Sequence, residues 1–171
     1  MEVAMEGDER SREYVRVEER LERLLMHETD FVAAMATTCC ELHHSFKDHF
    51  DWTGFYRVAT EGDALVVGPY QGTHGCLRIP FGKGVCGAAA SQRKTQLVPD
   101  VHAFPGHIAC SSTTKSEIVV PVMTPAGDLV AVLDVDSNRP DAFREASDLR
   151  HLERICSMLG RRPWTTGLSV A

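Results

Sequence analysis

The sequence lacks any apolar run that approaches the length of a membrane span. Its first 14 residues, MEVAMEGDERSREY, are acidic, whereas a secretory or organelle-import segment is basic or apolar. Both absences exclude a membrane protein and a secreted one. We therefore expect a cytoplasmic protein without a membrane partner.

An excess of positive charge is also missing. Lys and Arg total 18 against 24 Asp and Glu, which gives a net charge of −6 at pH 7. A net negative charge does not favour binding to nucleic acid, whose phosphates are also negative, so a small molecule is the expected partner. No internal repeat is present, and 171 residues with 43% hydrophobic content suit one domain with one core.

The six cysteines are too sparse for a disulfide framework, and no Cys-x-x-Cys pair occurs. Spacings of 10 and 24 residues separate Cys76, Cys86 and Cys110, which together with His74, His102 and His107 offer soft ligands. Structural zinc sites use short paired spacings instead. We predict no metal site and no cofactor.

The contexts of the cysteines divide them into two groups. Cys39, Cys40 and Cys156 lie in helical patterns, where a small buried side chain is expected. Cys76, Cys86 and Cys110 are flanked by Gly, Pro, Ser or His, where a thiol adds little to packing and suggests chemistry. Cys86 lies near the start of a predicted helix, a position that favours the thiolate.

Patterns of aromatic and β-branched residues predict a sheet built from hairpins. Residues 52–58 and 64–70 form one hairpin, and residues 117–137 form a second that turns at 124–127. Short strands are expected in LRIPF and in TQLVPD. With helices at both ends of this region, the sequence predicts an α+β fold, a central antiparallel sheet with helices packed on one face.

The chain ends are predicted to lie outside this domain. Residues 1–28 form a charged helical extension, with a weak apolar stripe at Tyr14, Val17, Leu21 and Leu24. A helix capped by Thr29 or Asp30 begins the domain, which spans 29–160. Residues 161–171 show no periodicity and are expected to be a frayed tail.

Six ordered blocks carry a family resemblance: DWTGFYRV, LVVGPYQG, CLRIPFGKGVCG, DVHAFPGHIACSS, SEIVVPV and LDVDS. Together they resemble the free methionine-(R)-sulfoxide reductases, which are built on a GAF domain. The resemblance implies reduction of the free amino acid, with thioredoxin as the reductant. It implies that Cys110 is the reactive cysteine and that Cys76 and Cys86 are recycling cysteines, and it leaves open which of these two resolves. It also leaves open whether the chain forms a homodimer.

The reaction explains these residue types. A sulfoxide is electrophilic at sulfur, and its oxygen must be protonated to leave, so a reductase without a cofactor needs a thiolate and a nearby acid. Cys110 and Glu117 meet these needs. Attack leaves a sulfenic acid on Cys110, which a second cysteine converts to a disulfide.

The resemblance places Glu117, Asp134 and Asp136 around the pocket for the substrate's ammonium group. The alternation of strand residues puts both aspartates on one face, and crowded carboxylates raise one another's pKa. The alternative is that Glu117 caps its strand and the aspartates are a solvated strand end.

Trp52 and Tyr56 lie four residues apart in a strand and share a face. The resemblance favours a role for both in holding the methyl-sulfur group, since sulfur packs well on aromatic rings. The alternative is an ordinary aromatic pair in the core. For the whole chain, the main alternative is a non-catalytic GAF module that senses a small molecule.

Overall fold

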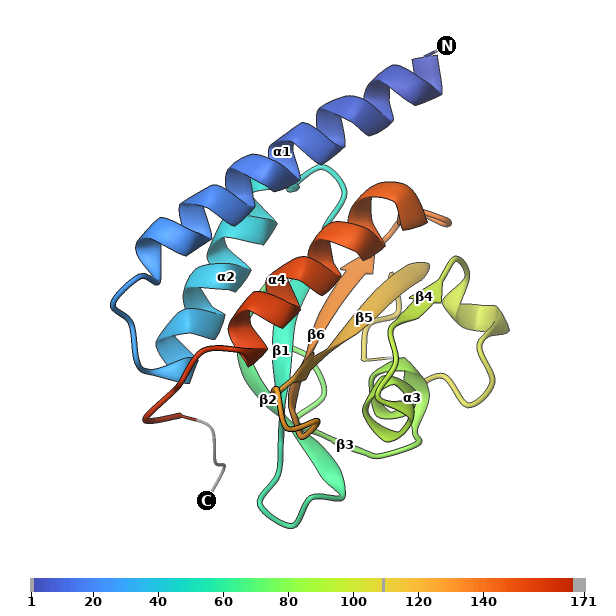
Figure 1. The fold of residues 1–171 in the computed structure, drawn as a ribbon. Helices are drawn as coiled ribbons and strands as arrows, with labels where there is room; N and C mark the ends of the chain where they lie inside the picture. The colour runs from blue at the N-terminus through green and yellow to red at the C-terminus, as the bar shows by residue number, and fades with distance from the viewer. Residues whose placement is uncertain (1, 109, 168–171) are drawn as a thin grey trace.

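The computed structural model describes residues 2–108 and 110–167 (Figure 1). The elements follow in the order α1 (Glu2–Leu24), α2 (Phe31–Ser45), β1 (Trp52–Val58), β2 (Ala64–Gln71), β3 (Arg78–Pro80), α3 (Gly84–Gln92), β4 (Gln96–Val98), the 3₁₀ turn η1 (Val101–Ala103), β5 (Ser116–Met123), β6 (Leu129–Ser137), the π-helical turn η2 (Glu145–Leu149) and α4 (Arg150–Gly160). The predicted hairpins β1–β2 and β5–β6 are both present.

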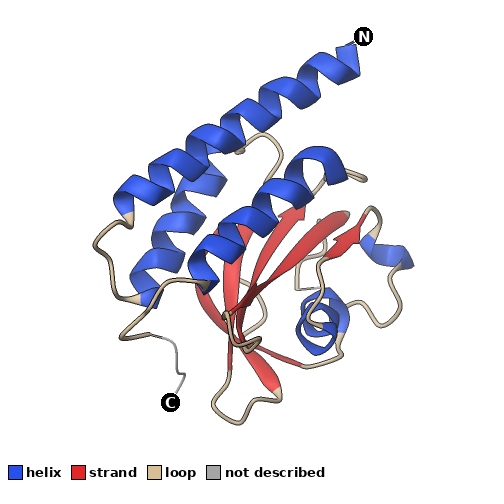
Figure 2. Cartoon of the chain, viewed as in Figure 1, coloured by secondary structure: helices blue, strands red, loops and turns tan. Residues whose placement is uncertain are grey.

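Within the described segments, six strands form one antiparallel sheet in the order β3-β2-β1-β6-β5-β4 (Figure 2). The central contact joins β1 to β6, strands from opposite ends of the domain. This pairing brings the first hairpin beside the second. It determines which polar residues meet at the centre of the sheet.

Both faces of the sheet are covered. Helices α1, α2 and α4 pack on one face, as predicted, whereas α3 lies on the opposite face (Figure 1). The expectation of helices on one face alone is therefore wrong for α3. The physical reason is visible in β5, where Ile118 packs against the three-helix side and its neighbour Val119 packs against α3. A strand that is apolar on both faces needs cover on both.

The N-terminal helix is part of the core. Tyr14, Val17 and Leu21 are fully buried, and the Tyr14 hydroxyl donates a hydrogen bond of 2.7 Å to the buried carboxylate of Asp148. The predicted stripe is wrong at its last position, because Leu24 is 57% exposed and the next residue along the chain packs inward instead. The extension thus serves as a cover for the sheet.

The prediction of a frayed tail is wrong for residues 161–167, while 168–171 lie outside the described residues. The indole of Trp164 is buried, packs 5.5 Å from the ring of Phe31, and donates to the carbonyl of Leu159. Asp30 caps α2 by accepting from the Ala33 amide, as predicted, and its second oxygen accepts from the Thr166 hydroxyl. One large aromatic side chain anchors a segment that lacks periodicity.

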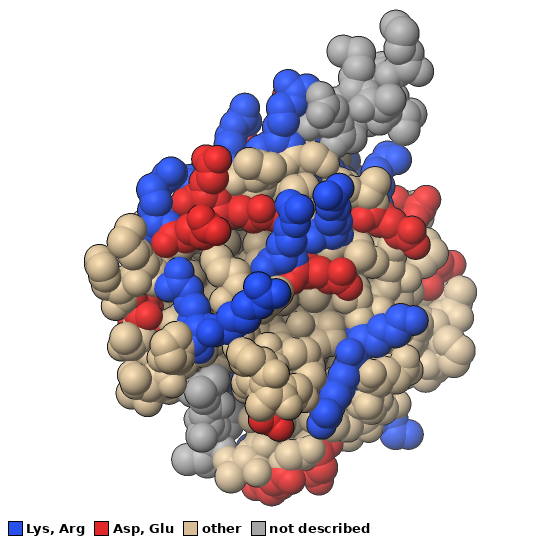
Figure 3. Space-filling view, viewed as in Figure 1, with Lys and Arg blue, Asp and Glu red and all other residues tan. Residues whose placement is uncertain are grey.

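No helix among the described residues combines the length and the apolar character needed to cross a membrane. Acidic and basic side chains are interspersed over the face that carries α1 and α4 (Figure 3). Several of them form ion pairs, among them Arg20 with Glu13 and Glu41. This face therefore presents charges of both signs.

Candidate active site

The register of the central strands gathers the predicted site residues. Trp52 of β1 lies opposite Asp136 of β6, and Glu117 of β5 lies opposite the same aspartate. Asp134 lies two residues before Asp136 in β6, so the two side chains share one face of the sheet. Val135, between them, points to the opposite face and packs in the core under α1, α2 and α4. The same-face prediction for the two aspartates is confirmed.

These side chains line a cavity of about 220 Å³ between the sheet, α3 and the loops before β5. This volume lies below the usual range for drug-sized ligands and suits a smaller molecule. Of the predicted residues, all but one line the cavity: Trp52, Tyr56, Cys86, Cys110, Glu117, Asp134 and Asp136. Cys76 joins the site through a covalent bond.

That bond is a disulfide between Cys76 and Cys110, with the two Cα atoms 5.3 Å apart. The separation is typical of protein disulfides. The two cysteines come from loops 34 residues apart, which the bond holds together beside the cavity. Both residues are partly exposed, so an external thiol can reach them.

Cys86 differs from the other two loop cysteines because it is free and buried. Its Sγ lies 3.9 Å from Glu117 Oε1, to which the thiol donates. Burial, together with the charges of Asp134 and Glu117, raises the pKa of Cys86 well above its usual value. The expectation of a thiolate at the helix start is therefore wrong, because burial and two carboxyls outweigh the helix dipole.

The cysteines predicted to be buried in helices divide in two. Cys39 and Cys156 are buried in the core, as expected, whereas Cys40 is exposed. Consecutive helical residues point about 100° apart, so the helix cannot bury both members of a Cys-Cys pair on one narrow face.

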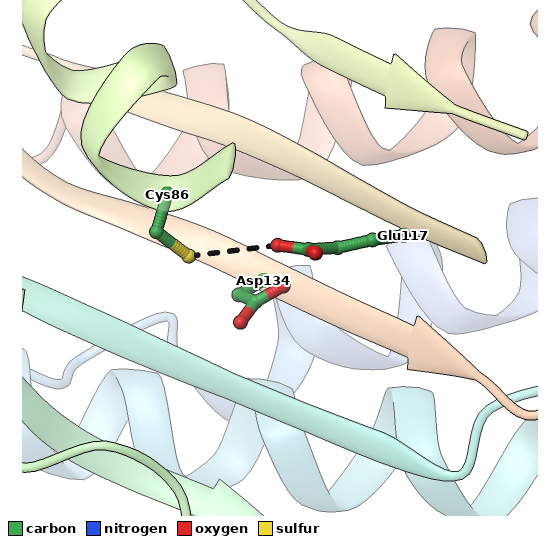
Figure 4. A group of neighbouring side chains, drawn as sticks. All are labelled: Cys86, Glu117 and Asp134. Atoms are coloured by element: carbon green, nitrogen blue, oxygen red, sulfur yellow. Dashed lines mark hydrogen bonds between the residues drawn. The ribbon is translucent and has the colours of Figure 1, made fainter. Parts of the chain in front are cut away.

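Three carboxyl groups converge on the cavity without a basic partner. Figure 4 shows Glu117 and Asp134 approaching the Cys86 thiol from β5 and β6. Among residues 2–108 and 110–167, no lysine, arginine or histidine forms an ion pair with Glu117, Asp134 or Asp136. The Oδ1 atom of Asp134 is buried and accepts no hydrogen bond from any residue that the structure describes. The site thus has an unmet capacity for a cation or a donor.

Burial controls the protonation of this group. It raises the pKa of Asp134 from 3.8 to about 7. It also raises the pKa of Glu117 and of Asp136 well above their usual values, with further contributions from the charge of Asp134. At neutral pH the site therefore retains protons, and at least one carboxyl group can donate one.

These shifts predict how stability varies with pH. A carboxyl whose folded pKa is raised keeps its proton longer in the folded chain than in the unfolded one, so stability is lost as pH rises. We expect the free energy of unfolding to fall between about pH 4 and pH 7. Asp134→Asn should reduce this slope, whereas Asp63→Asn at an exposed turn should not. Urea titrations of the ligand-free protein across this range measure the slope, and an unchanged slope in Asp134→Asn would contradict the prediction.

An aromatic wall closes another side of the cavity. The Trp52 ring stacks against Tyr56 at 5.8 Å and against Tyr70 at 5.3 Å. Its indole N–H donates a 2.8 Å hydrogen bond to the carbonyl of Thr73, in the loop that leads to Cys76. Trp52 and Tyr56 pack in the α3-side core and also line the cavity. Both rings therefore belong to the core, and their role in holding the methyl-sulfur group stays a prediction.

Gly54 makes this wall possible. A Cβ at Gly54 would lie 2.3 Å from the Trp52 ring and 2.5 Å from Tyr70 Cβ. We expect Gly54→Ala to displace the ring and to destabilise the fold by about 1–3 kcal/mol, the usual cost of overpacking. Gly68→Ala on β2 is the milder comparison, because its nearest neighbour would be 3.0 Å away. Urea unfolding followed by tryptophan fluorescence measures both, and equal losses would argue against a special role for Gly54.

Comparison with known families gives the site a context. The family model described as "GAF domain" matches residues 28–161, which is most of the chain. The chain belongs to the GAF domain family. The matched residues include the predicted span of 29–160, and the match confirms the predicted GAF fold. All the residues that line the cavity lie within this matched region.

Relatives of this GAF chain include named reductases. It is 42% identical to the free methionine-R-sulfoxide reductase of Escherichia coli, over 84% of each chain. It is 39% identical to the enzyme of that name from Saccharomyces cerevisiae, over 84% of this chain and 86% of the relative. The solved structure of the Neisseria meningitidis reductase in complex with its substrate is 44% identical, with a TM-score of 0.81 and 86% of each chain covered. The family resemblance is thereby confirmed.

Sequence reasoning did not place several polar residues in the cavity, although it had named His74 and His107 as candidate metal ligands. His74, Lys83 and His107 lie in its loops, and Asp51 and Asn138 lie at its sheet edge. The Asp51 carboxylate accepts a 2.7 Å hydrogen bond from the backbone N–H of Asn138, which ties the start of β1 to the end of β6. Both residues flank predicted strands, but only the pairing of β1 with β6 brings them together.

Proposed function

We propose that this chain reduces free methionine-(R)-sulfoxide to methionine, using Cys110 as the nucleophile and thioredoxin as the final reductant. One observation carries the proposal: the buried carboxyl groups of Glu117 and Asp134 and the half-buried one of Asp136 share a cavity with Cys110, which is bonded to Cys76. None of the three carboxyls forms an ion pair with a basic side chain among the described residues. The ammonium group of a free amino acid can pair with the carboxyl groups. The oxygen of a sulfoxide can be transferred to the cysteine. The similarity to named reductases supports the same conclusion.

Substrate binding follows from the charges. The ammonium group of a free amino acid compensates the carboxyls and donates to Asp134 Oδ1, which lacks a partner in the described residues. A charged group is buried at tolerable cost only when it is paired in this way. The methyl-sulfoxide end then packs on Trp52 and Tyr56, where sulfur makes favourable contacts.

The first step transfers oxygen from the substrate to the enzyme. The Cys110 thiolate attacks the sulfoxide sulfur and forms an S–S bond while an acid protonates the sulfoxide oxygen. That hydroxyl then moves to the Cys110 sulfur as the S–S bond breaks, and the products are methionine and a sulfenic acid on Cys110. Glu117 is the proposed acid, because burial and the charge of Asp134 raise its pKa and so favour its protonated form. The Cys86 thiol donates to Glu117 Oε1 and so orients the carboxyl.

The second step removes the oxygen as water. The Cys76 thiol condenses with the sulfenic acid to give the Cys76–Cys110 disulfide, and this is the pairing that the structure contains. We therefore assign Cys76 as the main resolving thiol. Reduced thioredoxin then reduces this partly exposed disulfide by thiol–disulfide exchange. The dithiol of thioredoxin becomes a disulfide, and Cys76 and Cys110 become thiols again.

Substrate form tests the proposal. We expect rapid turnover of free L-methionine-(R)-sulfoxide and at least a 100-fold lower kcat/KM for its N-acetylated, C-amidated form, whose nitrogen carries no charge to match the carboxyls. Chromatographic measurement of methionine, with thioredoxin and its reductase regenerating the enzyme, gives both rates. Equal turnover of the two forms would contradict the ammonium site, and binding of the free sulfoxide without any methionine formed would instead support a GAF sensor.

A further inference from the structure

The Cys86 thiol and the carboxyls of Glu117 and Asp134 are arranged as metal ligands are. One ligand atom from each lies within 4.8 Å of the other two. They come from α3, β5 and β6, so the fold, and no short sequence motif, brings them together (Figure 4). All three residues are buried, each being at most 6% exposed.

The spacing suits a tetrahedral ion. With zinc–sulfur and zinc–oxygen bonds of about 2.3 and 2.1 Å, two ligands of a tetrahedral site lie about 3.6 Å apart. The distance from Cys86 Sγ to Glu117 Oε1 is 3.9 Å. A shift of a few tenths of an ångström therefore brings both atoms onto one ion.

An independent observation points to a missing partner at this place. Asp134 lines the cavity, and its buried Oδ1 atom accepts no hydrogen bond from the described residues. Buried polar atoms are nearly always satisfied, so this oxygen calls for a donor or a cation. A divalent cation bound here would take the place of the protons that the thiol and the two carboxyls release.

We propose that Cys86, Glu117 and Asp134 form a binding site for one thiophilic divalent cation, with Zn²⁺ and Cd²⁺ as the chemical class. The thiolate selects against Mg²⁺ and Ca²⁺, which take only oxygen ligands and need more of them. All three ligand residues line the cavity. The loop ligands considered in the sequence include Cys76 and Cys110, which are joined in a disulfide. The set proposed here uses neither of them.

The consequence for activity rests on the proposed function. A metal ion at Asp134 and Glu117 occupies the carboxyls assigned to the substrate's ammonium group and to the proton donor. Zinc should therefore inhibit turnover in competition with the free sulfoxide. The binding itself is independent of turnover, so it can be tested on a chain that reduces nothing.

The test uses the protein with its Cys76–Cys110 disulfide intact, stripped of metal by a chelator and then desalted. Cd²⁺ is titrated in, the ultraviolet thiolate-to-cadmium band is recorded, and equilibrium dialysis counts the bound ions. We expect one Cd²⁺ per chain, accompanied by this band, and no displacement by excess Mg²⁺. Absence of binding, or displacement by Mg²⁺, would overturn the proposal.

Variants assign the ligands. Cys86→Ser should abolish the band, and Asp134→Asn should weaken binding by more than about 100-fold, the upper range seen when a mere outer-shell partner is lost. Cys40→Ser and Cys156→Ser, which alter the exposed and a core thiol, are the matched controls and should bind as the parent does. Circular dichroism checks each fold, and Glu117→Gln replaces Cys86→Ser if that variant unfolds. A band that persists in Cys86→Ser, or full affinity in Asp134→Asn, would refute the site.

Discussion

Cys110→Ser is expected to abolish methionine formation, even for a single turnover. A serine hydroxyl at neutral pH is a far weaker nucleophile than a partly ionised thiol, so the oxygen-transfer step itself is lost. A rapid-quench measurement of methionine formed per chain, without any added reductant, should give none. Binding of the free sulfoxide should remain, since the carboxyls and the aromatic wall are unchanged.

Cys76→Ser should behave differently, because the resolving thiol acts after methionine has left. About one methionine per chain should still appear in a burst, while steady turnover with thioredoxin stops for want of a disulfide. Mass measurement should find the sulfenic acid on Cys110. Cys40→Ser is the control and should keep both phases. A burst that survives in Cys110→Ser and disappears in Cys86→Ser would make Cys86 the attacking thiol.

Glu117→Gln should lower kcat by about two to four powers of ten, the usual contribution of a general acid. Glutamine keeps the shape and still offers an oxygen to the Cys86 thiol, but it has no proton to transfer to the sulfoxide oxygen. Because burial already favours the neutral form of Glu117, the variant should unfold at the same temperature or a higher one. Initial rates and thermal melts measure the two effects.

The matched control is Glu61→Gln, which changes the same residue type at an exposed turn. It should alter neither the rate nor the melting temperature. Near-full activity in Glu117→Gln would reassign the proton donor to Asp134 or Asp136. Unfolding of that variant would show that the carboxyl serves the fold more than the reaction.

Two of the corrections have the same cause. Cys86 was expected to be an activated thiol because it stands near a helix start, yet it is buried beside two carboxyls and its pKa is raised. Trp164 was expected in a frayed tail, yet it is buried against Phe31. In both cases local sequence describes the residue's own segment, while its environment is supplied by elements far away in the chain.

The sequence by itself determined the local structure and the chemical types present at the site. Alternation along β6 puts Asp134 and Asp136 on one face whatever the fold, because strand side chains alternate. Likewise, turn residues delimit the hairpins. The family resemblance then supplied the GAF fold, which the family comparison confirms.

Only the tertiary structure decided how these pieces meet. The pairing of β1 with β6 sets Trp52 opposite Asp136, and the loops before β3 and β5 bring Cys76 to Cys110. Helix α3 carries Cys86 over the sheet to within 3.9 Å of Glu117. Strand order and helix placement arise from contacts between segments that are distant in the sequence. The free energy of each contact depends on the apolar surface that one segment buries against another. The pattern of residues within a single segment therefore does not predict these contacts.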